Sequence, residues 1–331
     1  MTIGDERPRL SAASALTAAA EAASYAPSIH NTQPWHWRVA GDVLELHAEP
    51  ARQLATTDPD GRLMVLSCGA ALHHARTALA AEGWTADIER LPAPARPSLL
   101  ARVRATGRAD ADPHAMRHLQ TIRIRHTDRR PVSDTPVEQG ALDVIRGAIE
   151  GEYSWLHLLR REDVLDLAAA ADRAQVLETF DPQWRDEIAY WAGGVRSDGL
   201  GIPASAIPAE APQTTVPGRD FGVRGDLQIS AEHDGAAAYG ILFGPEDTQM
   251  AWLRGGEALS AGWLVATELG ISLVPMSAAI EVEVTRAIIR RLISGLGEPL
   301  LLMRLGHPDP DRAGPPHTPR LEPSQTIEIV N

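Results

Sequence analysis

A short segment near the N-terminus concentrates side chains that can donate and accept hydrogen bonds. Residues 26–37 read APSIHNTQPWHW, in a chain whose Phe, Trp and Tyr content is only 5%. Pro27 and Pro34 exclude the interior of a helix, because each lacks a backbone N–H and has a fixed φ. Two interpretations fit: a surface loop that leads into a strand, or a rigid loop that presents hydrogen-bond donors to a planar ligand.

A second segment concentrates positive charge. Residues 123–130 read RIRHTDRR, and all 31 basic residues of the chain are arginines. Arg125 and Arg129 can offer forked guanidinium donors to an anion, and His126 and Thr127 can add further donors. The start of a solvated basic helix would explain the same residues, so this segment alone leaves both interpretations open.

The other reactive residue types form no catalytic or metal-binding pattern. Cys68 is the single cysteine, which excludes an intrachain disulfide, and its small apolar neighbours predict a packed, inert thiol. His73 and His74 are adjacent and cannot share a metal. His114 and His118 have helical i,i+4 spacing but no third ligand, so we expect no metal site. The segments GLGIP and GLGEP lack a phosphate-loop lysine, and we assign no catalytic residue.

The composition is that of a globular protein of about two domains. The chain has 331 residues, of which 44% are hydrophobic and 23% are charged. Its net charge of −13 argues against nucleic acid or an anionic membrane as a partner. The start, MTIGDERPRL, is unlike a signal peptide, and Glu268 and Pro275 interrupt the longest apolar region, 258–280. With one cysteine, these features predict a cytoplasmic protein without a membrane span.

Hydrophobic periodicity predicts helices and strands in both halves of the chain. In the first half we expect a hairpin that turns at Gly41 and Asp42, helices over 11–24 and 69–84, and a strand over 99–107. In the second half we expect helices over 141–150, 164–177, 183–194 and 256–271, and strands over 236–244 and 299–308.

Two of the expected helices share a pattern of glycines. Gly69 and Gly83 are 14 positions apart, as are Gly256 and Gly270, and Ala-Leu follows two residues after the first glycine of each pair. The second glycine of each pair is suited to a helix C-cap. So short a match can arise by chance, but the similar order of elements favours an internal duplication with a pseudo-twofold axis.

The two polar segments resemble the signatures of a known family. PSIHNTQPW is similar to the loop of the FMN-dependent nitroreductase superfamily in which Pro-Ser, Asn and Gln-Pro-Trp recur, and RHTDR resembles that family's Arg-x-Ser/Thr-x-Arg/Lys segment. Ordinary members carry both elements and form two sites in a dimer. Here one copy of each element occurs, in different halves, as in the double-length, single-chain Acg-type branch.

The resemblance implies an α+β, nitroreductase-like fold with two tandem halves, residues 1–118 and 119–331, that form a pseudo-dimer and enclose one FMN. It implies that Pro27, Ser28, His30 and Asn31 reach the flavin ring or ribityl chain, with Gln33-Pro34-Trp35 supporting the loop. It assigns the phosphate to Arg125, His126, Thr127, Arg129 and Arg320, and the flavin-facing turn to Pro275, Met276 and Ser277. Met276 could equally fill the core.

The implied function is transfer of electrons from NAD(P)H through FMN to a nitro compound, a quinone or a similar acceptor. Two alternatives remain: a protein that stores or sequesters FMN, and a scaffold that binds no flavin. Residues 197–223 contain four prolines and four glycines, so they form either a lid over the cofactor or a disordered loop. Whether the chain associates further is left open.

Overall fold

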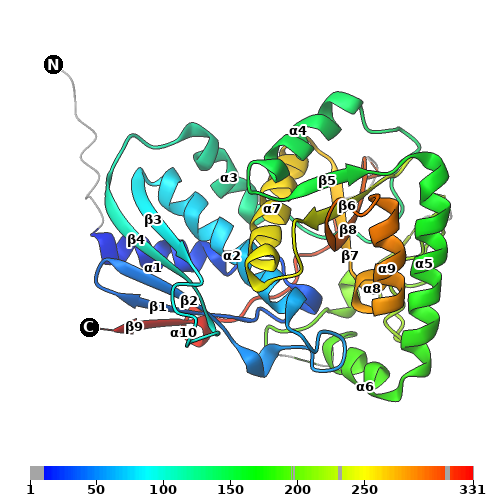
Figure 1. Ribbon diagram of the computed structural model, residues 1–331, viewed down its shortest axis with the longest axis horizontal. Coiled ribbons are helices and arrows are strands. Elements are labelled where there is room, and N and C mark those ends of the chain that lie inside the picture. Colours follow the sequence, from blue (N-terminus) through cyan, green and yellow to red (C-terminus); the bar gives the residue numbers. More distant parts are fainter. Residues whose placement is uncertain (1–10, 195, 197, 230–232, 310–313, 331) are drawn as a thin grey trace.

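The first half of the chain builds a five-stranded sheet that the last strand of the sequence completes. The computed structural model describes residues 11–194, 196, 198–229, 233–309 and 314–330. The strands lie in the order β3-β4-β2-β1-β9 (Figure 1). Their bounds are Trp35–Ala40 for β1, Val43–Ala48 for β2, Trp84–Arg90 for β3, Leu99–Arg108 for β4 and Ile327–Val330 for β9. Because β9 pairs in parallel with β1, the C-terminal segment returns to the first half.

The hairpin predicted from the sequence is confirmed. β1 and β2 pair antiparallel, with Ala40 opposite Val43. Gly41 turns the chain with a φ of +60°, a conformation that glycine adopts without steric cost. Successive side chains of a strand point to opposite faces, so Trp35 and Trp37 both point inward and are fully buried.

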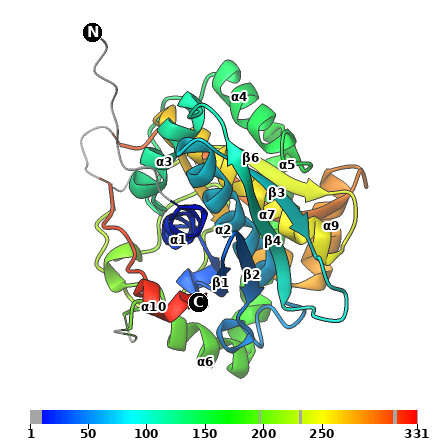
Figure 2. The same ribbon diagram turned by 90° about the vertical axis from the view of Figure 1, so that its left-hand side faces the viewer.

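Helices α1 (Ala12–Ala23) and α2 (Arg62–Ala81) pack against this sheet and enclose the first core (Figure 2). The start of α1 is confirmed, since the Ser11 side chain accepts a hydrogen bond from the backbone N–H of Ser14. The expected start of the next helix at Gly69 is wrong. The carboxylate of Asp58 accepts hydrogen bonds from the first N–H groups of α2, so the helix begins earlier.

The second half builds a four-stranded antiparallel sheet with helices on both faces. The strand order is β5-β6-β8-β7, with bounds Trp155–Leu158, Ala238–Gly244, Glu298–Gly306 and Ser272–Met276 respectively. One face is covered by α4 (Gln139–Glu150) and α7 (Gln249–Glu268). The other is covered by α5 (Arg161–Phe180), α8 (Ala278–Glu281) and α9 (Glu283–Leu292).

The apolar sequence of β6 follows from this double cover. Leu242 packs in the core under α4 and α7, whereas its neighbours Ile241 and Phe243 pack in the core under α5, α8 and α9. A strand that is buried on both faces has no solvent side on which polar residues would be favourable. The sequence prediction of a strand here is confirmed.

The two halves meet along α2 and α7, which lie side by side at the centre of the molecule (Figure 1). Each helix has 20 residues, and each position of α2 corresponds to the position 187 residues later in α7. A Cβ on Gly69 would lie 2.0 Å from the Leu253 carbonyl oxygen, and one on Gly256 would lie 1.8 Å from the Leu66 carbonyl oxygen. These contacts are reciprocal, as they are across a twofold axis.

The remaining elements were harder to predict. The sequence analysis did not assign β3, β5, β7, β9 or α9. Of these, β5, β7 and β9 are short, whereas β3 alternates between half-buried and exposed residues and α9 has a marked apolar face, so both carried a periodic signal that was missed. The expected half boundary, between residues 118 and 119, falls inside α3 (Pro113–Ile124). Two further helices are α6 (Pro182–Trp191) and α10 (Pro323–Thr326).

Two expectations concern membranes and targeting. No helix in the described part of the chain has both the length and the apolarity needed to cross a bilayer. Residues 1–10, for which the sequence predicts no signal peptide, lie outside the described residues.

Candidate functional site

A cavity of about 500 Å³ lies between the two halves. This volume is within the usual range of roughly 300–1,000 Å³ for sites that hold a small molecule or cofactor. Its wall includes every residue that the resemblance implies: Pro27, Ser28, His30, Asn31, Arg125, His126, Thr127, Arg129, Pro275, Met276, Ser277 and Arg320. The structure therefore brings together the loop before β1, the segment after α3, the end of β7 and the C-terminal segment.

Two arginines, Arg125 buried and Arg320 half-buried, form one corner of the cavity. Arg125 follows the last residue of α3, and its Nη2 atom donates to the carbonyl oxygen of Tyr25 at 3.4 Å. Arg320 donates from Nη2 to the same oxygen at 3.2 Å. Neither arginine has a carboxylate within ion-pair distance among the described residues, and the Nε atoms of both are buried without a hydrogen-bond partner.

Burial makes this corner unfavourable for its own positive charge. It lowers the pKa of Arg125 to about 9, with a further contribution from Arg320, and it lowers the pKa of Arg320 to about 10. A buried cation without a counter-charge is costly, and an anion would remove that cost. The corner is therefore suited to an anionic group.

Two histidines extend the same corner. The rings of His126 and His317 meet edge to face, with centroids 5.8 Å apart. Burial lowers the pKa of His317, and so do His126, Arg125 and Arg320. An anion would therefore meet imidazole donors as well as guanidinium groups. The sequence had pointed to His126 but not to His317, although His317 lies in the same PHTPR segment as Arg320.

A second group of residues lies around Phe221. Arg129 stacks over the Phe221 ring, with its guanidinium carbon 5.3 Å from the ring centroid, and donates to the carbonyl oxygen of Ala206 at 3.0 Å. Burial lowers the pKa of Arg129 to about 10. Arg129 thus has different neighbours from Arg125 and Arg320, whereas the resemblance assigned all three to one phosphate.

His30 lies beside the same ring. Its imidazole meets Phe221 edge to face at 5.9 Å, and its Nε2 atom is buried without a hydrogen-bond partner among the described residues. Burial, together with Arg219 and Arg129, lowers the pKa of His30 well below its ordinary value, so the ring is neutral at pH 7. The residue has a φ of 44°, in the left-handed region that is uncommon for a side chain other than glycine. The strained loop holds this imidazole in place.

Asn31 joins three segments of the wall. Its Nδ2 atom donates to the carbonyl oxygens of Gly201 and Pro319, at 3.0 Å each. Its Oδ1 atom accepts a hydrogen bond from Arg320 at 3.1 Å. The side-chain amide is therefore used within the protein, where it positions one of the two corner arginines.

Gln33 supports the loop, in agreement with the supporting role expected for Gln33-Pro34-Trp35. Its Nε2 atom donates to the carbonyl oxygen of Gly199 at 2.8 Å, and its Oε1 atom accepts from the N–H of Leu321 at 3.0 Å. Gln33, like Asn31, ties the first loop to chain segments more than 160 residues away.

The segment expected to be a lid forms one wall of the cavity. We call residues 198–229 the strap; Ser197, the first residue of the expected lid, lies outside the described residues. The strap contributes a short 3-10 helix, Ala204–Ala206, and packs against α6 through an apolar cluster. The members of this cluster are Trp184, Ile188, Ala192, Ile202, Ala206, Ile207 and Phe221. The structure shows these residues as an ordered segment and not as a disordered loop.

A buried arginine fixes the strap to the second half. Arg219 pairs with Glu281 on α8 and lies 3.6 Å from Glu178 on α5. Its Nη2 atom also donates to the Ser277 hydroxyl at 3.4 Å. Burial raises the pKa of Glu178 to about 8, with a further contribution from Glu281, while Arg219 acts in the opposite direction. Sequence patterns gave no reason to single out these three residues.

Met276 has two kinds of neighbour. It lines the cavity at the end of β7, and it also packs on the core under α5, α8 and α9. Its packing on the core is thus observed, and its contact with a flavin stays a prediction.

The pseudo-symmetric counterpart of this site is filled by ion pairs. Arg76 in α2 corresponds to Trp263 in α7, which lines the cavity. Arg76 binds Glu152 at 2.7 Å and Glu257 at 2.5 Å, and Arg90 also binds Glu257 at 2.7 Å. Paired charged side chains thus surround Arg76, whereas its counterpart Trp263 lines a cavity.

The other candidates from the sequence are structural. Cys68 is fully buried, and burial raises the pKa of its thiol, which makes it unreactive. His73 bonds the Ser260 hydroxyl at 2.8 Å, and His118 lies 3.6 Å from Glu268. Within the described ranges, no group of three or more His, Cys, Asp or Glu residues could hold a metal ion.

Fold and cavity together define a single-chain α+β protein with one composite site between its halves. No family model matches the chain. Its sequence is 39% identical over 312 residues to Rv3131 of Mycobacterium tuberculosis strain H37Rv, named as a candidate NAD(P)H nitroreductase, covering 92% of this chain and 88% of that protein. It is 32% identical over 310 residues to the protein acg of the same strain, which has the same kind of name, covering 92% of each chain. The chain therefore belongs to the Acg-type branch of the nitroreductase family.

Solved structures are more distantly similar. The FMN-dependent nitroreductase NfnB of Mycobacterium smegmatis, in complex with NADPH, has a TM-score of 0.41 and 14% identity, covering 66% of this chain and all of that one. A nitroreductase of Bacteroides fragilis with bound FMN has a TM-score of 0.40 and 16% identity, covering 65% of this chain and 98% of that one. Similarity at this level is too weak to support an inference about the present site.

Proposed function

We propose that this protein is an FMN-dependent oxidoreductase that binds one flavin between its halves and uses NAD(P)H to reduce nitro or quinone-type acceptors. The observation that carries this proposal is the buried corner of Arg125 and Arg320, two cations without a carboxylate partner that share the Tyr25 carbonyl oxygen. Their unpartnered Nε atoms need acceptors, and a phosphate monoester offers three acceptor oxygens and roughly two negative charges.

The residues present fit FMN at both ends of the cavity. Arg125, Arg320, His126 and Thr127 would hold the phosphate. The aromatic, basic and backbone groups around His30, Phe221 and Arg129, together with Pro275 to Ser277, would surround the flavin ring. Bound FMN supplies two-electron chemistry, taking a hydride from a nicotinamide and passing electrons to the acceptor.

The protein's own contribution is charge, orientation and exclusion of water. Arg129 keeps a positive charge at the ring end of the cavity, and pre-placed positive charge favours any negative charge that develops there. Neutral His30 can act as a hydrogen-bond donor or acceptor through its free Nε2 atom. The strap closes one wall and limits the entry of water. This chemistry requires no protein nucleophile.

The names of the relatives favour a nicotinamide as reductant. Both Rv3131 and the acg protein are named as NAD(P)H nitroreductases, and each matches nine-tenths of the present chain. Their names leave the physiological acceptor unspecified.

The strap favours a second candidate function, the storage or sequestration of FMN. The strap forms a cavity wall and is fixed by the buried Arg219–Glu281 pair, so a bound flavin would be shielded from a second substrate. The two functions require the same flavin site and differ only in whether a nicotinamide gains access to it.

Anaerobic titration of the FMN-loaded protein with NADH and NADPH separates these functions. Rapid loss of the flavin's visible absorbance with either nicotinamide, and its return on addition of a nitroaromatic or quinone, supports the oxidoreductase. Bleaching by dithionite but not by nicotinamides supports storage. A protein that stays colourless after incubation with FMN contradicts both functions.

A further inference from the structure

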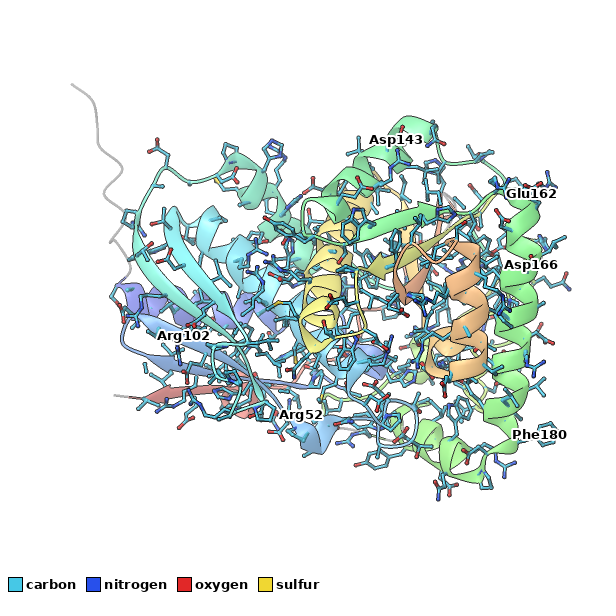
Figure 3. All side chains as sticks on the ribbon, in the orientation of Figure 1. Arg52, Arg102, Asp143, Glu162, Asp166 and Phe180 are labelled. Carbon is cyan, nitrogen blue, oxygen red and sulfur yellow. The ribbon has the colours of Figure 1, made fainter. Side chains whose placement is uncertain are left out.

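The outer face of α5 carries an apolar stripe that no other part of the described chain covers. Leu165 is 68% exposed, Val176 is 47% exposed and Phe180 is 82% exposed, and Ala169 between them is exposed as well. Their spacings of 4, 7 and 4 residues place all four on one side of a helix. Figure 3 shows α5 at the edge of the molecule, with Phe180 projecting away from it.

The opposite face of α5 packs against the second half of the chain. Leu167 and Ala174 are fully buried in the core under this helix, and Ala171 and Gln175 line the cavity. The helix is therefore anchored on its inner side, and its outer side should be polar if it faced only water. On the neighbouring helix α9, Val284 is 45% exposed as well.

Two opposite charges lie at the centre of the stripe. Asp172 and Arg173 are both exposed, and neither makes an ion pair or side-chain hydrogen bond with any residue that the structure describes. By contrast, Arg160 at the start of the same helix pairs with Glu162 and Asp163. The central charges are thus free to bind a partner.

The stripe is complementary to itself. If a second copy of α5 runs antiparallel across a twofold axis between positions 172 and 173, Leu165 lies opposite the partner's Phe180, and Ala169 lies opposite the partner's Val176. Asp172 then lies opposite the partner's Arg173, and the symmetry produces this ion pair twice. This one register pairs all four apolar residues and both central charges.

We propose that the exposed face of α5 is a homodimer interface, in which two copies of the chain pack α5 against α5 in this antiparallel register. Such an interface has two ion pairs at the twofold axis, flanked on each side by apolar contacts between Leu165 and Phe180 and between Ala169 and Val176. The interface is independent of the proposed flavin chemistry, because its residues lie on the face of α5 that is turned away from the cavity.

Sedimentation velocity of the full-length, FMN-loaded chain tests the proposal. We expect dimers at about 0.1 mM, where an interface of micromolar affinity is saturated. Phe180→Asp should weaken dimerisation by at least about 30-fold, because it places a charge against the apolar side chain of the partner's Leu165. The matched control is Leu296→Asp, a residue that is 70% exposed in the loop before β8; its dimerisation should match the unaltered protein.

A charge swap tests the register. Asp172→Arg alone should weaken dimerisation, because it places like charges opposite each other, and adding Arg173→Asp should restore it. The proposal would be overturned if the unaltered protein were monomeric at about 0.1 mM. It would also be overturned if the double variant dimerised no more tightly than Asp172→Arg alone. Unfolding temperature and flavin content, which these exposed substitutions should leave unchanged, verify that each variant is folded and separate this result from failure of the flavin proposal.

Discussion

Folding and anion binding place opposite requirements on Arg125 and Arg320. Arg125 is buried and Arg320 is half-buried, and both donate to one carbonyl oxygen. Burial lowers the pKa of each by disfavouring the charged form. An arginine in this position is unfavourable for folding in the absence of a ligand and favourable for binding an anion. Active sites commonly combine a loss of stability with a gain of function in this way.

The variant Arg125→Gln tests this balance. Without flavin, we expect it to be more stable than the unaltered protein by about 1 kcal/mol, because a buried cation is removed. Its affinity for FMN should fall roughly 10- to 100-fold, the cost of losing charged hydrogen bonds. Thermal unfolding of the flavin-free protein and fluorescence titration with FMN measure the two effects.

The neighbouring exposed residue Arg123 provides the control. It bonds the Tyr25 hydroxyl and lies outside the cavity wall, so Arg123→Gln should bind FMN as the unaltered protein does. If both variants lost FMN affinity equally, removal of any nearby positive charge would weaken binding, and the assignment of Arg125 to the phosphate would be wrong.

The types of the site residues could be predicted from the sequence, but their partners could not. Pro27 to Asn31 and Arg125 to Arg129 were recognisable because their signatures are contiguous. Arg219 and Phe221 lie in a proline-rich segment without periodicity, so nothing local marks them as parts of the cavity wall. The contact of Asn31 with Gly201 and Pro319 joins residues that only the folded chain brings together.

The strap is held by a buried pair of carboxylates around Arg219. The pKa of Glu178 is raised from 4.5 to about 8 by burial and by Glu281. Its carboxyl therefore binds a proton more readily in the folded chain than in the unfolded one. This contribution to stability is complete below pH 4.5 and is lost as the pH rises through 8.

We expect the strap to be held less tightly at pH 9 than at pH 6. Hydrogen exchange of the backbone amides of residues 198–229, corrected for the intrinsic rate at each pH, measures this change. In Glu178→Gln the difference between the two pH values should shrink, because this carboxyl no longer titrates. An undiminished difference in that variant would show that another group controls the strap.

The crossing of α2 and α7 depends on two glycines. Gly256→Ala should destabilise the protein by at least about 1–3 kcal/mol, because its Cβ would lie 1.8 Å from the backbone oxygen of Leu66 and the helices cannot approach as closely. Gly147→Ala in α4 is the control. Its Cβ would have no atom within 4 Å, so better helix propensity should stabilise the protein by up to about 1 kcal/mol.

Chemical denaturation of the two glycine variants measures these changes. If Gly256→Ala and Gly147→Ala changed the free energy of unfolding by similar amounts, the close approach of α2 and α7 at Gly256 would not be important for stability.

Long periodic elements were predicted best. The hairpin at Gly41 and the helix α1 have a turn glycine and a capping serine, respectively. The helix expected over 256–271 is present as α7, but its expected start is wrong because α7 begins at Gln249. The strand β7 contains Pro275 and was expected as a turn, and β9 has only four residues. Each pairs with a strand that is distant in the sequence, β7 with β8 and β9 with β1, which is information that a local sequence window does not contain.

The two halves of the molecule are similar at their central helices, but the candidate cofactor cavity occurs once among the described residues. The central helices α2 and α7 obey the same 187-residue offset, and their glycines make reciprocal contacts. The duplicated glycine spacing was visible in the sequence. The ion pairs of Arg76 and Arg90 with Glu257 were not, because these residues come from three separate elements.

Glu257 holds this counterpart region together. It is fully buried between two arginines, so Glu257→Ala leaves both guanidinium groups without their shared carboxylate. We expect a loss of roughly 3–5 kcal/mol in the free energy of unfolding, measured by chemical denaturation. The exposed pair of Asp143 and Arg146 is the comparison, since Asp143→Ala should cost less than about 1 kcal/mol. Equal losses in the two variants would contradict this account.

The most direct test of one composite flavin site is the stoichiometry of FMN binding to the purified chain. Titration followed by flavin fluorescence should saturate at one FMN per chain, and the double variant Arg125→Gln with Arg320→Gln should show no saturable binding at the same concentrations. Saturation at two flavins per chain, or unchanged binding by the folded double variant, would contradict a single site built around these arginines.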